Sequence, residues 1–577
     1  MTSQLLNNGQ AGVLLLSLVP GLPLLVALLL VMRSSRRTGM RFAAWSTLPA
    51  LAAALLLQPG IDLEVAWFFM GGRMGIDEMG RSFLLLAALV WGAAAWFAHG
   101  YLGDDPQRHR FFFFYLITMA FNFGLILAQD MLGFYLFFGL MSISAYGLIV
   151  HRGSPEARRA GRVYMVLVMV GEILLFSGMV LMAARLPDLE LATIAASPTG
   201  NLSLTLLFIG FGIKAGLLPL HVWLPLAHPV APAPASAVLS GVMIKAGLLG
   251  WLRFLPMSQE IILPGWGEAL IILGLMAAFY GVAIGLTQTD TKTILAYSSI
   301  SQMGIMTMLV GCGLLAPNQW PQVATAVSIY ALHHGLAKAS LFLATGLPMA
   351  QKNSQAAPYL ILLPALALAG LPLTSGAIAK FAMKEIVHGL PAPWLTLLGC
   401  VLPLTALATT LIVCHFLKTM AARQPQETAR GAAVMTRAWL LLWLAVALLP
   451  WFWPHQQAYA AHVTQLNLIW QGLWPVLAGG AMMLAAWRWW PSGRGISVPA
   501  GDILWIFWSQ DHPPTAAKRP PQQKQRSDKE ALSQQLQQIF HLVARHSRRL
   551  EKMLMRWSLT GTAYLLLGLL FLVLLLK

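Results

Sequence analysis

Four lysines lie near the centres of long apolar stretches, where charged side chains are rare. These lysines are Lys214, Lys245, Lys338 and Lys380. Inserting a lysine at the middle of a hydrocarbon layer costs about 3 kcal/mol on insertion scales, and ionisable residues at that depth usually mark paths for ions or protons. Lys384 and Lys418 stand nearer the ends of their stretches, so we expect their ammonium groups to reach the membrane surface. The four central lysines therefore predict an ion or proton path.

Lysine is suited to such a path because its amine can change protonation state when it leaves water. Desolvation favours the neutral form of an amine whose reference pKa is about 10.4. A lysine that faces an acid keeps its proton, and one that meets a second cation releases it. His334 precedes Lys338 by one helical turn on the same face, and imidazole relays protons at neutral pH. His333 points to another face, and we expect a structural role for it.

The composition indicates a membrane protein with many spans. Of the 577 residues, 58% are hydrophobic and only 10% are charged, whereas a soluble domain carries about a quarter charged residues. Apolar stretches of about twenty residues recur along the chain, and each is long enough to cross a hydrocarbon core of about 30 Å. The stretch at 11–32 follows no basic segment and no small-residue cleavage site, so we expect a retained helix and not a signal peptide.

The net charge of +17 comes largely from arginines in short loops between apolar stretches. This distribution is the positive-inside pattern, which places those loops in the cytoplasm and predicts anionic lipid as a partner. Basic residues confined to such loops do not indicate nucleic-acid binding. With these loops inside, a chain of sixteen spans leaves both termini on the outer side of the cell inner membrane.

The predicted fold is an all-α polytopic membrane protein with about sixteen transmembrane helices. The expected spans are 11–32, 42–57, 81–100, 110–128, 131–150, 161–184, 203–222, 233–255, 263–287, 292–314, 322–347, 358–384, 393–418, 435–454, 467–489 and 558–576. Two spans, at 203–222 and 358–384, contain Gly, Pro and a central lysine. Interrupted helices at matching positions of two halves are typical of transporters built from inverted repeats. The backbone groups freed at each break need water or polar side chains, so each break predicts a hydrated pocket.

The expected organisation follows from these spans. Residues 1–109 hold the N-terminal transmembrane helices, 110–255 the first five-helix repeat, 263–418 the second repeat, and 435–489 further C-terminal transmembrane helices. Residues 490–557 form a cytoplasmic linker and a short amphipathic helix, which lies along the membrane surface or is an ordinary solvated helix joining two spans. Residues 558–577 form the last transmembrane helix.

Several stretches resemble one known family. The run 214–237, KAGLLPLHVWLPLAHPVAPAPASA, is the longest; KTILAYSSISQMG at 292–304, HGLAKASLFLATG at 334–346 and the broken span at 358–384 also match. The sequence resembles the proton-conducting antiporter-like family, over about residues 75–420. That family includes the large membrane subunits of respiratory complex I, of membrane-bound hydrogenases and formate hydrogenlyases, and of multisubunit sodium/proton antiporters.

The resemblance implies roles by position. Lys214 would be the lysine of the first broken helix, Lys245 the connecting lysine of the next span, and His334 with Lys338 the central relay. Lys380 would be the ionisable residue of the second broken helix. His221 and His228 flank the first broken helix and are candidates for proton uptake, although they could also merely cap it.

One departure concerns the acid that partners the first broken-helix lysine. The family usually carries the sequence WELMS on the fifth span, whereas this chain has FGLMS at 138–142, with Gly139 at the position of the glutamate. Glu172, near the middle of the next span, could replace it from an adjacent helix. We therefore hypothesise a Glu172–Lys214 pair; the alternative is a Glu172 satisfied by another polar neighbour.

These patterns predict a proton-translocating subunit of a complex I-related or hydrogenase-type oxidoreductase. The three cysteines have no metal-ligand or disulfide spacing, and no phosphate-binding or nucleophile motif is present, so no cofactor and no chemistry of its own are expected. The expected partners are other membrane and peripheral subunits, protons and anionic lipid. Three alternatives remain: a multisubunit sodium/proton antiporter subunit that also moves Na⁺, the membrane subunit of an energised inorganic-carbon uptake system, and a structural subunit that no longer conducts.

Overall fold

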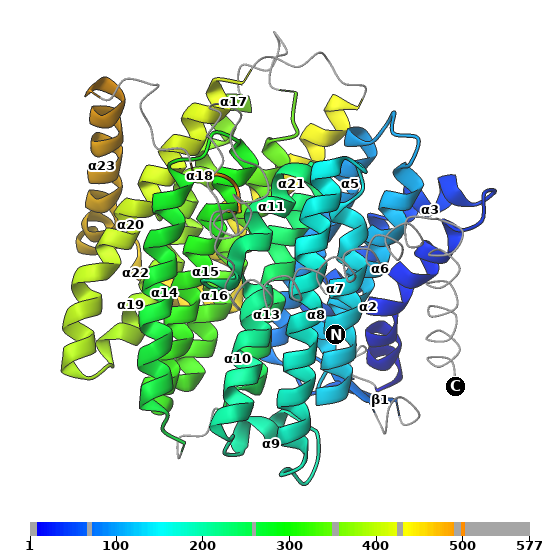
Figure 1. The fold of residues 1–577 in the computed structure, drawn as a ribbon, viewed down its shortest axis with the longest axis horizontal. Coiled ribbons are helices and arrows are strands. Elements are labelled where there is room, and N and C mark those ends of the chain that lie inside the picture. Colours follow the sequence, from blue (N-terminus) through cyan, green and yellow to red (C-terminus); the bar gives the residue numbers. More distant parts are fainter. Residues whose placement is uncertain are drawn as a thin grey trace, which may run out of the picture. The chain divides into compact units, whose positions relative to one another are not determined.

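The fold is a bundle of helices that run mostly side by side (Figure 1). The structure is a computed structural model, and it describes residues 9–65, 72–256, 261–348, 357–423, 431–489 and 498–501. The predicted amphipathic helix, the linker before it apart from residues 498–501, and the last span at 558–576 lie outside these residues.

The N-terminal part consists of helices and one short hairpin. In order these are α2 (Gln10–Leu29), α3 (Arg36–Phe42), η1 (Trp45–Thr47), α4 (Leu48–Leu56), β1 (Asp62–Val65), β2 (Gly72–Gly75) and α5 (Glu78–Tyr101). The hairpin, which sequence reasoning did not predict, is antiparallel and pairs Asp62 with Gly75. Arg73 holds it to the loop before α9, because its guanidinium contacts Asp62 and Glu190.

The middle of the chain contains the first broken helix. Its elements are α6 (Arg108–Leu127), α7 (Met131–Ile149), α8 (Pro155–Ala183), α9 (Leu191–Ala196), α10 (Asn201–Ala215), η2 (Leu220–Val222), α11 (Trp223–Val230), α12 (Ala233–Val238), the π-turn η3 (Leu239–Met243) and α13 (Ile244–Phe254). Asp130 accepts a hydrogen bond from the Gly133 amide at 2.7 Å, which caps α7.

The second half repeats the same kind of interruption. Its elements are α14 (Pro264–Gly285), α15 (Thr291–Leu315), η4 (Pro317–Gln319), α16 (Trp320–Ala344), α17 (Ala357–Leu360), α18 (Leu362–Ala369), α19 (Ser375–His388), α20 (Ala392–Ala421), α21 (Ala432–Phe452), α22 (Pro454–His462) and α23 (Leu466–Trp489).

Both predicted breaks are present and are built alike. Gly216 ends α10 with φ +72°, and Gly370 ends α18 with φ +84°, a left-handed conformation that glycine adopts without a Cβ penalty. Pro219 and Pro372 follow within three residues, where a proline cannot continue the preceding helix. Each break therefore leaves helix-end carbonyl groups in the interior that need donors.

The all-α polytopic membrane fold is confirmed, but the number of spans stays a prediction. In the described ranges, twelve helices are long and apolar enough to cross a membrane, or thirteen if the pair 36–42 and 45–56, bent by 50°, is one span. The helix α16 is outside that number because polar residues lower its hydropathy, and α18 and α19 are outside it because they are only 8 and 14 residues long. The inverted symmetry of the two repeats likewise stays a prediction.

Candidate functional site

Lys214 stands in the last turn of α10, just before the first break. Its side chain is 3% exposed, and its ammonium donates a hydrogen bond of 3.1 Å to the Tyr164 hydroxyl on α8. The Tyr164 hydroxyl in turn donates to the Ser142 carbonyl on α7 at 2.8 Å. The lysine is therefore held by hydrogen bonds inside the bundle and does not point to lipid.

Glu172 on α8 faces the same cavity as Lys214. Both residues line this cavity together with Ser142 and Tyr164. Oε2 of Glu172 is buried and has no hydrogen-bond partner among the described residues. A Cβ built on Gly139 would lie 3.3 Å from this Oε2. The Glu172 carboxylate thus occupies the space into which a side chain at position 139 would extend, although it makes no direct ion pair with Lys214 in the described residues.

Lys245 lies in the first turn of α13, directly after the π-turn η3. It is 1% exposed, and its ammonium donates to the Ser240 carbonyl within that turn at 2.6 Å. A π-turn widens the helix and disturbs the regular backbone pairing, and such turns are frequent at functional sites. The π-turn thus supplies an acceptor to an amine that would otherwise be unsatisfied.

Helix α16 carries two titratable groups that face Lys245. Lys338 is fully buried and donates to the Leu295 carbonyl of α15 at 2.8 Å. His334 is also fully buried, and neither of its ring nitrogens has a hydrogen-bond partner in the described part of the chain. Lys245 and Lys338 both lie within electrostatic reach of His334. Buried polar atoms are rarely left without partners, so we expect internal water to bind at this ring.

His333, for which the sequence predicted only a structural role, links the centre to the second break. A ring nitrogen of His333 is 2.8 Å from the hydroxyl of Ser375, the first residue of α19. Both Lys245 and Lys380 lie within electrostatic reach of its ring. The sequence predicted on which face of its helix His333 lies, but it did not predict that Ser375 would contact that face.

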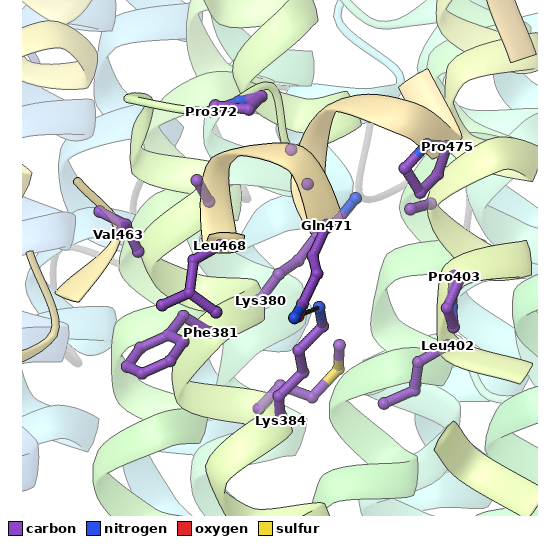
Figure 2. A pocket seen from close by; sticks show the side chains of 15 residues that line it. Pro372, Lys380, Phe381, Lys384, Leu402, Pro403, Val463, Leu468, Gln471 and Pro475 are labelled. Atoms are coloured by element: carbon purple, nitrogen blue, oxygen red, sulfur yellow. Dashed lines mark hydrogen bonds between the residues drawn. The ribbon is translucent and has the colours of Figure 1, made fainter. Parts of the chain in front are cut away.

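Lys380 lies on α19, past the second break. Its ammonium donates to the carbonyl of Ala369, the last residue of α18, so it satisfies one of the helix-end acceptors left by the break. The side chain is half-buried and lines a cavity that is shown in Figure 2. Lys384, expected at the membrane surface, lines the same cavity. Its ammonium donates to the Gln471 side chain of α23 at 3.3 Å.

His221 and His228, the candidates for proton uptake, are both fully buried. The ring of His221 meets Tyr280 edge-on at 5.3 Å between centroids, and the ring of His228 stacks on Phe342 at 4.5 Å. Neither ring nitrogen of His228 has a partner among the described residues. Lys292 belongs to one of the matching motifs but was not predicted as a site residue. It is 6% exposed and close enough to His228 for their charges to interact.

A titratable pair outside the spans joins two loops, with His151 between α7 and α8 and Asp105 between α5 and α6. Nε2 of His151 is 2.9 Å from the Asp105 carboxylate. Burial lowers the pKa of His151 below its ordinary value, and Asp105 only partly offsets this. For Asp105, burial alone would raise the pKa, but hydrogen bonds from His151 and the Gln107 amide lower it overall. Both shifts favour a neutral histidine beside a charged carboxylate.

The candidate polar groups, which we call the row, lie on helices that pack against one another. Helix α10 packs on α13, the π-turn η3 packs on α16, and α16 packs on α19. The row comprises Glu172, Lys214, Lys245, His333, His334, Lys338 and Lys380. Within the described ranges, no group of three or more His, Cys, Asp or Glu side chains is arranged to hold a metal ion.

Comparisons with known proteins agree with this architecture. A family described as NADH:quinone oxidoreductase/Mrp antiporter, TM, matches residues 128–405. NADH-quinone oxidoreductase subunit M of Rhodobacter capsulatus is 30% identical over 64% of this chain and 79% of its own length. Hydrogenase-4 component B of Escherichia coli (strain K12) is 34% identical over 41% of this chain, and the match spans only 36% of that protein.

The fold also matches a solved structure. One chain of the Mrp complex from Dietzia sp. DQ12-45-1b has a TM-score of 0.70 and 20% identity, and it covers 96% of this chain and 61% of its own length. At that identity the likeness concerns the fold alone. The longer relatives extend well beyond the part that this chain matches.

Proposed function

This chain belongs to the NADH:quinone oxidoreductase/Mrp antiporter transmembrane family, and from that premise we propose that it translocates protons as the antiporter-like subunit of a complex I-related or hydrogenase-type oxidoreductase. One observation supports the proposal above the others. Lys214, Lys245 and Lys338 are each 3% exposed or less, on α10, α13 and α16 of one packed bundle.

The proposed path uses changes in local charge to move protons between neighbouring groups. Two like charges about 6 Å apart repel by about 3 kcal/mol at an effective dielectric constant of 20. That energy corresponds to about a hundredfold change in proton affinity, so a proton arriving at one amine weakens the hold of the next. Glu172 would keep Lys214 charged until the pair is perturbed, and His334 would pass protons between Lys245 and Lys338 through water. Uptake would occur near His221 and His228.

The energy for this movement would come from partner subunits. The family's members named above are subunits of multisubunit membrane assemblies, and other subunits are the expected partners here as well. Redox chemistry would take place in those subunits, since the proposed path needs only proton-binding groups. We place the complex in the cell inner membrane with both termini on the outer side, and anionic lipid at its arginine-rich loops.

A second candidate is a subunit of a multisubunit Na⁺/H⁺ antiporter. The family description includes the Mrp antiporters, and the Mrp chain covers 96% of this chain in fold. The same row of lysines would serve either ion-coupled activity. Dependence of proton flux on added Na⁺ would favour this candidate over the oxidoreductase subunit.

The test is proton flux through the reconstituted native complex. The tagged full-length chain is purified from its own membranes with its co-eluting subunits and placed in liposomes with a potassium gradient and an internal pH dye. Valinomycin then sets a membrane potential. We expect flux with the wild type, its loss with Lys214→Met or Lys338→Met, and no change with Lys418→Met, whose ammonium lies over the Trp487 ring at 4.8 Å. Absence of flux with the wild type would overturn the proposal.

A further inference from the structure

The cavity beside the second break contains a lysine that the row described above does not use. Lys384 follows Lys380 by one turn of α19, and residues four apart lie on the same face of a helix. Figure 2 shows both side chains entering the cavity from α19, with Gln471 reaching Lys384 from α23. Gln471 is itself exposed, so Lys384 lies towards the open side of the cavity, whereas Lys380 lies at the break.

The two amines share the cavity without an acid. The residues that line it are, besides these lysines, apolar side chains, glycines and Gln471, with no carboxylate among them. Like charges four residues apart on a helix destabilise each other, so protonation of one amine weakens the hold of the other on its own proton. The cavity thus accommodates one extra proton more easily than two, so a proton reaching Lys380 displaces one from Lys384.

A third titratable residue continues this face to the helix end. His388 is the last residue of α19, its side chain is 69% exposed, and its Nδ1 lies 3.9 Å from the Glu385 carboxylate. Titratable groups therefore recur on consecutive turns, at 380, 384 and 388. They lead from the buried break to an exposed end of the helix.

We propose that Lys384 is a proton carrier in an outlet along α19, which leads from Lys380 past Gln471 to the exposed pair His388 and Glu385. This inference rests on the proposed proton translocation and adds the route by which protons leave the row. Gln471 holds the ammonium of Lys384 in position, so α23 takes part in the outlet although it lies outside both predicted repeats.

The decisive test distinguishes a proton carrier from a fixed charge. Arginine keeps a positive charge but does not release its proton, whereas histidine binds and releases one near neutral pH. In the reconstituted complex we expect Lys384→Met and Lys384→Arg each to lower proton flux by about tenfold or more, and Lys384→His to restore most of it. Lys418→Met serves as the matched control near α23, with no expected change.

The outcomes separate this inference from the proposed function. Wild-type flux that is lost with Lys214→Met but unchanged with Lys384→Met would overturn the outlet and leave proton translocation intact. Full activity of Lys384→Arg would also overturn it, because a fixed charge would then suffice. Absence of wild-type flux would overturn both. Co-elution of the partner subunits with each variant checks folding, and the arginine and histidine variants keep the test valid if the methionine variant does not assemble.

Discussion

The Glu172 carboxylate gives the sharpest prediction, because a glutamate placed at position 139 could supply the same acid from the neighbouring helix. A Cβ on Gly139 would lie 3.3 Å from Oε2 of Glu172, so a glutamate at 139 would direct its carboxylate into the same cavity. The perturbation has three parts: Glu172→Gln, Gly139→Glu, and the two together. The first removes the acid, the second adds another, and the third moves it to the adjacent helix.

The expected magnitude follows from the charge lost beside Lys214. An opposite charge about 6 Å away contributes about 3 kcal/mol at an effective dielectric constant of 20, which is about a hundredfold in the proton affinity of the lysine. Glu172→Gln should therefore lower proton flux by one to two orders of magnitude, roughly. Gly139→Glu alone should also impair proton flux, because two carboxylates would then repel each other in one cavity. The double variant should recover most of the wild-type flux.

The assay is the same reconstituted flux measurement, with Glu268→Gln as the control. Glu268 is an exposed glutamate on α14, and its replacement should leave the flux unchanged. Two results would refute the reasoning. One is full flux in Glu172→Gln, and the other is a double variant no better than Glu172→Gln, since the position of the acid in the cavity would then not matter.

Three further predictions concern stability. Asp77→Asn should break the ion pair in which Asp77 accepts hydrogen bonds from the 7% exposed Arg253, and should lower the free energy of unfolding by about 1–3 kcal/mol, because Asp77 is partly solvated. A lower Tm in detergent with unchanged flux per folded complex would agree with this prediction, and an unchanged Tm would contradict it. Gly370→Ala should lower the free energy of unfolding by about 1–3 kcal/mol, because φ at this residue is +84° and the added Cβ would strike the Lys380 ammonium. In the same melting experiment, Gly399→Ala should leave the Tm unchanged, because a Cβ there meets no other atom. Burial lowers the folded-state pKa of His151, so the stability that its neutral form contributes is present at neutral pH and is lost as pH falls below the ordinary histidine pKa of 6.5, whereas the lowered pKa of Asp105 acts only at more acidic pH. The wild-type Tm should therefore drop more between about pH 7 and about pH 5 than that of His151→Gln, and equal slopes would exclude His151 as the cause.

The sequence predicted the helices well where length and hydropathy decide the structure. Each expected span from 11–32 to 467–489 overlaps a helix or a broken helix. Both breaks were predicted because glycine and proline change the backbone directly, as Gly216 and Gly370 confirm. The hairpin β1–β2 was not predicted, since short strands on a loop carry no long apolar or alternating pattern. The π-turn before Lys245 was missed too, because no residue type specifies it.

The candidate site was only partly readable, because a site depends on neighbours in space. The burial of Lys214, Lys245 and Lys338 followed from their central positions in apolar stretches. The contact of His333 with Ser375 joins residues 42 positions apart, and no local pattern encodes it. Lys384 was assigned to the surface because it stands near a span end, and its hydrogen bond with the exposed Gln471 of α23, far along the chain, is a contact that no local pattern encodes.

The central claim is that the buried amines communicate through internal water, and His334 tests it most directly. Both ring nitrogens of His334 lack protein partners in the described residues, and the charges of Lys245 and Lys338 reach it. A high-resolution cryo-EM map of the native complex should show ordered waters within hydrogen-bonding distance of this ring, continuing towards both lysines. A dry, apolar contact around His334, with no water between it and Lys245 or Lys338, would contradict the account.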